Sequence, residues 1–331
     1  MTENNSHNDE NMSRREFIAR SAKAGFSIAA AAALGAFFYD PKGPTGRDEA
    51  NIVRLSNYAI RDLNPRMAIV SGADRFQTVR RGVKAVGGME TFVKKGDTVL
   101  IKVNAAFASP PSLCATTHPD VVRETVKMCL EAGASEVRVT DNPINDPASC
   151  FRLSGIQAAT EESGGKLYFP KEGYFRETTV KGGSLITRWP LLYEPFKGVD
   201  KLIGITPVKD HHRSGASMTL KNWYGLLGGR RNIFHQDIHN IIKELGMMAT
   251  PSLVILDGTQ TMMTNGPTGG SLSDLKETNV MIVSTDPVAA DAFGATLLEK
   301  TPSDLPFILK AADKDVGTAD WEGLGPERIS V

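Results

Sequence analysis

Residues suited to proton transfer, metal ligation or anion capture are concentrated in one loop after a predicted strand at 201–205. The loop contains Lys209, His211 and His212, and Lys221 follows them. Histidine exchanges protons near neutral pH, and lysine attracts anions by its charge. Apolar residues interleave these polar ones, so we interpret the loop as partly buried, with partners for its charges, rather than as a solvated surface loop. His211 and Lys221 are therefore candidate catalytic residues.

A second histidine pair lies in the next predicted helix, at residues 234–248. His235 and His239 are four residues apart, a spacing that puts both on one helical face and allows them to chelate a metal ion. The glutamate of a zinc-protease motif is absent between them. Four of the six histidines nevertheless fall within this loop and helix. We therefore expect His212, His235 and His239 to be the candidate metal ligands.

Further candidates lie where predicted strands end and predicted helices begin. His118 and Asp286 each precede a proline at a helix start, and helix N-termini attract anions. Both residues also fit the role of a helix cap, and this alternative stays open. Asp257 ends a predicted strand ahead of the glycine-rich stretch 265–270, so we expect a carboxylate at the carboxyl edge of a sheet. The glycines do not form a phosphate loop, because no Gly-Lys-Ser/Thr follows.

The elements that position these residues alternate between strands and helices. Strand–helix–strand units of this length imply parallel pairing. We therefore predict an α/β protein with a mostly parallel sheet, flanking helices and Rossmann-like units. Residues 145–198, rich in glycine, threonine, arginine and lysine, are predicted to form an insertion or lid. The predicted strands are 98–104, 136–140, 201–205, 253–256 and 280–283, and the predicted helices are 121–132, 234–248 and 287–299.

The N-terminal residues have the order of an export signal. Arg14 and Arg15 precede an aromatic and an aliphatic residue and then a short apolar run, which predicts a twin-arginine signal over residues 13–38. The apolar run of roughly 15 residues is shorter than the about 20 that span a bilayer. We expect a periplasmic or other extracytoplasmic protein that meets the twin-arginine translocase, with membrane anchoring if the signal is retained. The predicted parts are a signal or anchor (1–39), a linker (40–50) and one α/β domain (51–331).

Charge and cysteine content exclude two classes of function. The 38 basic and 38 acidic residues give a formal net charge of zero without a cluster of lysine and arginine, which argues against nucleic-acid binding. Cys114, Cys129 and Cys150 have no close pair spacing, which excludes a cysteine-ligated iron–sulfur or zinc site. Cys129 falls on the apolar face of a predicted helix. Whether Cys114 and Cys150 form a disulfide in an oxidising compartment stays open.

Six separated motifs between about residues 66 and 320 resemble the DUF362 family, a domain of unknown function. Some members of that family carry a ferredoxin-type cluster segment, but this chain lacks such a cysteine run, so no cluster is expected. Cofactor or ligand binding is expected from residues within the motifs, namely Lys102, Asn104, Lys221, Asn222 and Asp257. The motifs are 101–104, 116–120, 220–226, 257–258, 265–269 and 284–291.

A more distant similarity is to the N-terminal domain of lactate racemase-type enzymes. Those enzymes hold a nickel-pincer nucleotide on a lysine and use histidines for hydride and proton transfer. By this analogy His118 and His211 resemble proton-transfer histidines, Lys221 resembles the tethering lysine, and His235 resembles the nickel-ligating histidine. A shared fold does not by itself carry the function with it.

Together these features predict an exported protein with a crevice lined by histidine and lysine. We expect it to bind a metal, or a metal-organic cofactor of the nickel-pincer kind, together with a small anionic ligand. An isomerase or a redox-type enzyme is one interpretation, with His118, His211 and Lys221 as the catalytic residues. The alternative is a non-catalytic protein that binds or delivers a cofactor or ligand.

Overall fold

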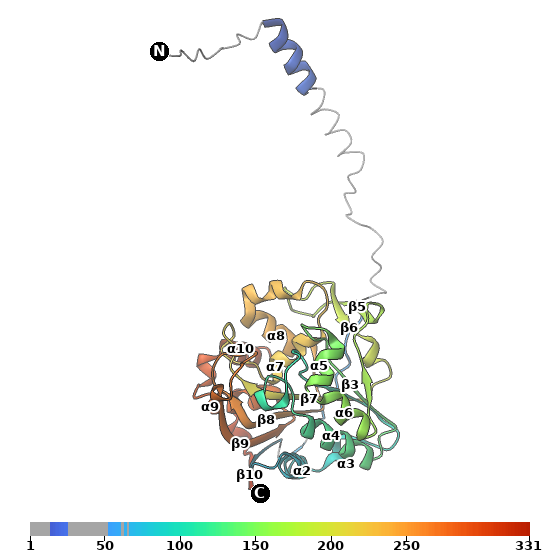
Figure 1. The fold of residues 1–331 in the computed structure, drawn as a ribbon, viewed down its shortest axis with the longest axis vertical. Coiled ribbons are helices and arrows are strands. Elements are labelled where there is room, and N and C mark those ends of the chain that lie inside the picture. The colour runs from blue at the N-terminus through green and yellow to red at the C-terminus, as the bar shows by residue number, and fades with distance from the viewer. Residues whose placement is uncertain (1–13, 26–51, 61–62, 65) are drawn as a thin grey trace, which may run out of the picture. The chain divides into compact units, whose positions relative to one another are not determined.

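The computed structural model describes residues 14–25, 52–60, 63–64 and 66–331 of the chain (Figure 1). It divides into two units, residues 1–50 and residues 51–331. In the first unit, residues 14–25 form an exposed helix, and the remainder of the predicted export signal lies outside the described residues. Within the described part, no helix is both long enough and apolar enough to cross a membrane.

The second unit is built on an eight-stranded sheet with the strand order β10-β1-β9-β8-β7-β2-β3-β4. The five strands from β8 to β4 in this order run parallel, as do β1 and β10. β9 runs antiparallel to both of its neighbours. The predicted α/β fold with a mostly parallel sheet is confirmed. The strands are β1 (Met67–Ser71), β2 (Thr98–Lys102), β3 (Glu136–Thr140), β4 (Lys166–Tyr168), β7 (Lys201–Lys209), β8 (Leu253–Met262), β9 (Leu275–Ser284) and β10 (Glu327–Ser330).

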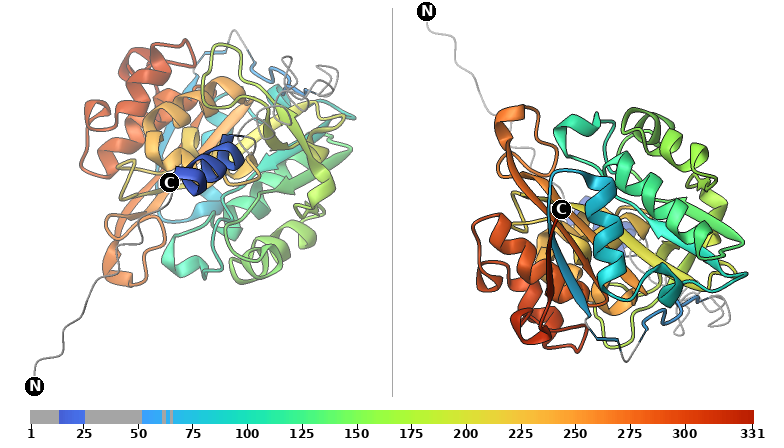
Figure 2. Two further views of the ribbon diagram at one scale, coloured as in Figure 1. Left: turned by 90° about the horizontal axis from the view of Figure 1, so that it is seen from above. Right: turned by 90° about the horizontal axis from the view of Figure 1, so that it is seen from below.

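Helices cover both faces of this sheet (Figure 2). Alternate residues of one strand belong to different core clusters: Leu100 packs with α8 and α9, whereas Ile101 packs with α2 and α4. This alternation is expected for strands buried on both faces. The helices are α2 (Arg75–Ala85), α3 (Met89–Phe92), α4 (Pro119–Glu131), α5 (Pro147–Leu153), α6 (Ile156–Glu162), α7 (Thr219–Asn222), α8 (Ile238–Met248), α9 (Pro287–Leu297) and α10 (Pro306–Ala312).

Side-chain caps determine where two of these helices begin. The Asp286 carboxylate accepts hydrogen bonds from the backbone N–H groups of Val288 and Ala289, each at 3.0 Å. His118 Nδ1 accepts one from the N–H of Asp120 at 3.3 Å. Both residues therefore act as helix caps, the alternative that the sequence left open.

Two elements differ from the sequence prediction, and each difference changes where candidate site residues lie in the fold. β8 continues from Leu253 to Met262, so Asp257 lies inside the strand instead of at its end. The helix expected over 234–248 is divided into a 3₁₀ helix, Arg231–Asp237, and α8, with non-helical backbone at Asp237 (φ −132°, ψ 60°). Because a 3₁₀ helix has three residues per turn, a spacing of four no longer aligns side chains on one face.

Part of the predicted insertion belongs to the main sheet. α5 and α6 follow β3 and lead to β4, which pairs in parallel with β3 at the edge of the sheet. The residues after β4 contain β5 (Phe175–Thr178) and β6 (Trp189–Leu192), which form an antiparallel hairpin in a separate sheet. The insertion is therefore narrower than expected and consists of the segment between β4 and β7.

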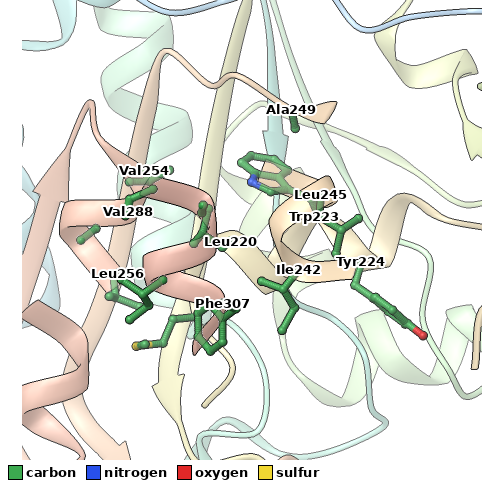
Figure 3. Packing of buried hydrophobic residues seen from close by; sticks show 14 of the residues in the cluster. Leu220, Trp223, Tyr224, Ile242, Leu245, Ala249, Val254, Leu256, Val288 and Phe307 are labelled. Carbon is green, nitrogen blue, oxygen red and sulfur yellow. The ribbon is translucent and has the colours of Figure 1, made fainter. Parts of the chain in front are cut away.

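Trp223 anchors the segment that carries the candidate residues Lys221 and Asn222. Its side chain is fully buried in the core formed by α7, α8 and the sheet (Figure 3). A Cβ at Gly204 of β7 would lie 2.9 Å from the indole ring, so this close approach requires glycine. Truncating a tryptophan buried in this way costs about 3–5 kcal/mol of stability. The core thus holds α7 against the middle of β7.

Asp291 of α9 fixes the start of α7 from the other side. Its carboxylate accepts hydrogen bonds from the backbone N–H groups of Thr219 (2.7 Å) and Leu220 (3.1 Å). Burial raises the pKa of Asp291 to about 7. The N-terminus of this short helix is therefore capped by a side chain distant in sequence, and Lys221 follows directly after it.

Candidate functional site

A pocket of about 680 Å³ lies at the carboxyl ends of three neighbouring parallel strands. β2 ends at Lys102, β3 is followed by Asp141, and β7 ends at Lys209, so the sheet delivers all three side chains to one edge. The loop 265–269 after β8 lines another side. This volume is typical of small-molecule sites. The other lining residues are Asn104, Ala106, Phe107, Asn142, Ile144, His211, His212, Ser217, Lys221, Asn222, Tyr224, Gly225, Arg231 and His235.

Lys102 and Asp141 form a buried ion pair in the pocket wall. Lys102 Nζ lies 2.7 Å from Asp141 Oδ1 and also donates to the Val103 carbonyl (2.6 Å) and to Asn222 Oδ1 (3.1 Å). Asp141 Oδ2 accepts a hydrogen bond from the backbone N–H of Ala105 at 2.6 Å. Burial lowers the pKa of Lys102, and the neighbouring carboxylate opposes that shift. The charge of Asp141 is therefore already balanced within the protein.

Lys209 is a second buried lysine, and its partners are neutral. Its ammonium donates to the Ala115 carbonyl and to Asn104 Oδ1 (3.3 Å), and it lies 5.3 Å from the centre of the Phe107 ring. Burial and, next in importance, the nearby charge of Lys221 lower the pKa of Lys209 to about 7. Because a nearby negative charge favours the protonated form of a lysine, an anion in the pocket would restore the charge of this one.

Lys221 is the lysine that faces the pocket without a polar partner. Within the described part of the chain, its ammonium has no hydrogen bond or ion pair, and it lies 5.2 Å from the centre of the Tyr224 ring. Such a cation–π contact only partly replaces water around an ammonium. Burial, followed by the charge of Arg231, lowers the pKa of Lys221 to about 8. Lys221 is therefore well placed to meet an anionic ligand.

Arg231 adds a fourth positive charge to the lining. Burial lowers its pKa, and the charge of Asp141 opposes that shift. Among the described lining residues, four side chains are cationic and Asp141 is the one carboxylate, so we call this site the cation pocket. The guanidinium donates to backbone carbonyls between 2.7 and 3.3 Å away, those of Asn142, Pro143, Tyr224 and Leu227.

Three histidines of the pocket are stacked with their rings nearly parallel. The ring centres of His211 and His212 are 5.0 Å apart, and those of His211 and His235 are 5.9 Å apart. His211 Nδ1 accepts hydrogen bonds from the backbone N–H groups of Arg213 (3.2 Å) and Ser214 (3.3 Å). In neutral His211 the proton is therefore on Nε2. Burial and then the charge of Lys221 lower the pKa of His211 to about 2, so this histidine is a neutral hydrogen-bond donor.

His235 carries its ring proton on Nδ1, whereas His211 carries it on Nε2. Its Nδ1 lies 3.2 Å from the Asn232 carbonyl and 3.1 Å from the Tyr224 hydroxyl oxygen. That hydroxyl donates its own proton to the Arg231 carbonyl, so both groups accept from His235 Nδ1–H. Nε2 of His235 consequently carries a lone pair, available to a proton or a metal. Burial and then Lys221 lower the pKa of His235, which keeps it neutral.

Two candidates from the sequence, His118 and Asp257, do not line the cation pocket. Asp257 pairs with Arg75 Nε of α2 at 2.8 Å, and His118 caps α4. Burial and then the charge of Arg75 lower the pKa of His118. Asp257 points to the face of the sheet that α2 covers, because successive residues of a strand point to opposite faces, and His118 lies at the N-terminus of α4. The proposed pairing of His118 with His211 and Lys221 in one site is therefore not observed.

The three predicted metal ligands are not brought together. His212 and His235 line the cation pocket, whereas His239 of α8 stacks against Phe307 at 6.2 Å, and its Nδ1 is buried without a hydrogen bond. The change from 3₁₀ helix to α-helix at Asp237 separates His239 from His235. In the described ranges, no group of three or more histidine, cysteine, aspartate or glutamate side chains is arranged to hold a metal ion.

Some pocket residues were not among those expected from the sequence. Asp141 directly follows the strand 136–140, so the rule that ligands bind at carboxyl ends of parallel strands was a usable signal for it. Lys209 was noted in the histidine loop without a role. Tyr224 lies within the motif 220–226 but was given no role, and Arg231 had no local signal, because its partners are backbone carbonyls. The expected residues that do line the pocket are Lys102, Asn104, His211, His212, Lys221, Asn222 and His235.

The three cysteines are buried free thiols. Cys114 and Cys150 are therefore not paired. Burial raises the pKa of each of these two thiols to about 11, which makes them unreactive at neutral pH. The Cys114 thiol donates a hydrogen bond to Gln260 Oε1 at 3.3 Å.

The fold and the site together define an α/β protein with a cation-lined pocket at the carboxyl edge of its sheet. This chain belongs to the DUF362 family, a domain of unknown function, whose model matches residues 99–296. The family resemblance seen in the sequence motifs is confirmed. A thylakoid-associated protein from Synechocystis sp. is 26% identical over 253 residues, which are 72% of this chain and 74% of that protein.

Among solved structures, the lactate racemase apoprotein from Thermoanaerobacterium thermosaccharolyticum aligns with a TM-score of 0.38 and 11% identity. The alignment covers 71% of this chain and 57% of that chain. A protein from Thermotoga maritima aligns with a TM-score of 0.30 and 13% identity, over 55% of this chain and 49% of that chain. This chain thus spans about half the length of these structural neighbours.

Proposed function

We propose that this chain is an exported member of the family that binds a small anionic organic molecule in the cation pocket. The observation that carries the proposal is the charge imbalance of the lining. Three lysines and one arginine face one carboxylate, and that carboxylate is paired with Lys102. The Lys221 ammonium has no polar partner among the described residues. A bound anion would supply that partner and offset the cost of burying these charges.

In this proposal two histidines handle protons in different ways. The Nε2 lone pair of His235 accepts a proton from the ligand, and the Nε2–H of His211 donates a hydrogen bond to a negatively charged oxygen. The charge of Lys221 stabilises negative charge that develops on the ligand. These groups suit a proton-transfer reaction such as an isomerisation.

A metal carried by an organic cofactor also fits the donor set. His235 offers one neutral imidazole nitrogen and Lys221 an amine, whereas the described residues form no ligand group for a bare ion. His235 would complete the coordination of such a metal, and Lys221 would hold the anionic part of the cofactor. Such a group would supply Lewis-acid or hydride chemistry.

The second candidate function is a non-catalytic protein that binds or delivers the same ligand. One observation favours it: His211 Nδ1 accepts hydrogen bonds from the backbone N–H groups of Arg213 and Ser214, so this ring has no free nitrogen to serve as a second base beside His235. Proton exchange separates the two functions. In deuterated water, an enzyme of the first kind exchanges a carbon-bound hydrogen of the ligand, and His235→Gln abolishes the exchange. A carrier exchanges none.

The binding proposal is tested on protein purified from the periplasm without denaturation. Intact mass and metal analysis detect a bound or attached cofactor, and calorimetry measures the affinity for phosphate, sulfate and acetate. We expect Lys221→Met to lose the cofactor or to weaken anion binding at least about tenfold, equal to about 1.4 kcal/mol. The matched control is Lys127→Met, an exposed lysine of α4, which should behave like the wild type. Wild-type protein that carries no cofactor and binds none of these anions contradicts the proposal.

Export by the twin-arginine pathway is part of the same proposal. Arg14 and Arg15 lie in the exposed helix of residues 14–25, where a receptor can reach them. This pathway transports folded proteins, which suits a chain that must acquire a ligand before export.

A further inference from the structure

A second and shallower pocket, of about 460 Å³, adjoins the cation pocket. Five residues line both: Asn142, Ile144, Tyr224, Arg231 and His235. These five residues therefore form a wall that the two pockets share. We call this second pocket the apolar annex. Pro143, Ile144 and Phe175 form its apolar surface.

The hairpin of β5 and β6 holds Phe175 in the annex. A Cβ on Gly228 would lie 2.6 Å from the Phe175 ring, so the ring packs directly on this glycine. The backbone N–H of Gly228 donates to the Pro190 carbonyl at 2.8 Å, and Trp189 Nε1 donates to the Gly228 carbonyl at 3.1 Å. The hairpin is thus fastened to the segment that leads to Arg231. The narrowed insertion supplies one wall of the annex.

Ile144 marks the junction between the two pockets. Its side chain is 64% exposed, one of the most exposed large apolar side chains in the described part of the chain. Its backbone N–H donates to the Ala106 carbonyl at 3.0 Å, and Ala106 lines the cation pocket. An exposed apolar side chain at the mouth of a binding pocket gains free energy when a ligand covers it.

The charges of the two compartments differ. Among the described residues that line the annex, Arg231 is the one with a charged side chain. Its guanidinium donates hydrogen bonds to four backbone carbonyls. Lys221, with no polar partner, lines the cation pocket and not the annex. We propose that the ligand is elongated, with an anionic head near Lys221 and an uncharged apolar body that passes His235 and lies on Ile144 and Phe175. This inference rests on the proposed anion-binding function and names the class of its ligand.

The experiment compares anions that differ only in an apolar body. Inorganic phosphate, sulfate and acetate are paired with phenyl phosphate, phenyl sulfate and phenylacetate, and calorimetry measures the affinity of each for the full chain. We expect a phenyl compound to bind at least about tenfold more tightly than its parent anion. Ile144→Ser should weaken the phenyl compound about fivefold and leave the parent anion unchanged. The matched control, Leu153→Ser, removes an apolar side chain of α5 that is 50% exposed and lines neither pocket.

The outcomes separate this inference from the function on which it rests. If anions bind and depend on Lys221, but the phenyl group adds no affinity or Ile144→Ser weakens both members of a pair equally, the annex proposal is wrong and the anion site stands. If the purified protein carries no cofactor and none of the six compounds binds, both proposals fail. Phe175→Leu, which retains an apolar side chain against Gly228, is a second variant and should reproduce the selective loss. If it weakens both members of a pair equally, the annex proposal is also contradicted.

Discussion

Replacing Lys221 with methionine should stabilise the protein at neutral pH while it removes the cation that we propose meets the ligand. Lys221 lies on α7, and burial followed by the charge of Arg231 lowers its pKa from 10.5 to about 8. Each pH unit between these values corresponds to about 1.4 kcal/mol. The charged side chain therefore costs up to about 3 kcal/mol at neutral pH, and methionine has a similar length without that cost.

The pH dependence of the free energy of unfolding shows at which pH the substitution stabilises the protein most. The unfolded chain keeps the Lys221 proton up to about pH 10.5, whereas the folded chain releases it near pH 8. Between these values the unfolded state binds more protons, so the free energy of unfolding of the wild type rises with pH. Below about pH 8 the folded protein carries the full cost of burying the charged Lys221 side chain. The advantage of Lys221→Met should therefore be largest at neutral pH and should shrink toward pH 10.5.

Urea denaturation followed by tryptophan fluorescence, to which the buried Trp223 contributes, measures the effect. Wild type, Lys221→Met and the exposed-lysine control Lys127→Met are compared at about pH 7 and about pH 9.5. The control should stay within about 0.5 kcal/mol of the wild type at both values. A destabilised Lys221→Met protein, or a gain that is equal at both pH values, would refute the argument that a buried charge is the cause.

Three further predictions follow from the same geometry. Asp141→Asn leaves Lys102 buried without its carboxylate and should lower the free energy of unfolding by about 3–5 kcal/mol; a loss below about 1 kcal/mol would show that the pair is not desolvated. Anion affinity should fall about tenfold between pH 7 and pH 9, because Lys221 loses its proton near pH 8, and calorimetry of Lys221→Met should show a shallower decline. Replacing Arg14 and Arg15 with lysine should retain the chain in the cytoplasm on cell fractionation, and unchanged export would contradict the twin-arginine proposal.

Five strands of the main sheet were readable from the sequence because their apolar residues are buried on both faces, whereas β1 and β10 were not predicted. Parallel strands under two layers of helices appear as short apolar runs, and β2, β3 and the first part of β7 matched the expected positions. The ends of β8 and β9 were not readable. These two strands continue as an antiparallel pair with polar residues such as Gln260 and Glu277, whose backbone hydrogen bonds maintain the pairing. Their apolar patterns therefore stop before the strands do.

The candidate site was predictable where side chains come directly from strand ends. Lys102 and Asn104 line the pocket because parallel strands end at the same edge. Asp257, which lies within β8, and His118, which caps α4, lie on the other side of the sheet. Local sequence does not show which face a residue takes after a strand, since one additional residue reverses the direction of the side chain.

The sequence by itself determined the α/β class, the family and the residue types that the pocket contains. Only the tertiary structure decided the state of those residues. The Nδ1 atoms of His211 and His235 meet backbone N–H donors in one case and oxygen acceptors in the other, so the two histidines have opposite tautomers. The lowered pKa values of Lys209 and Lys221 arise from burial beside other charges. Tautomer and pKa depend on neighbours that only folding brings together.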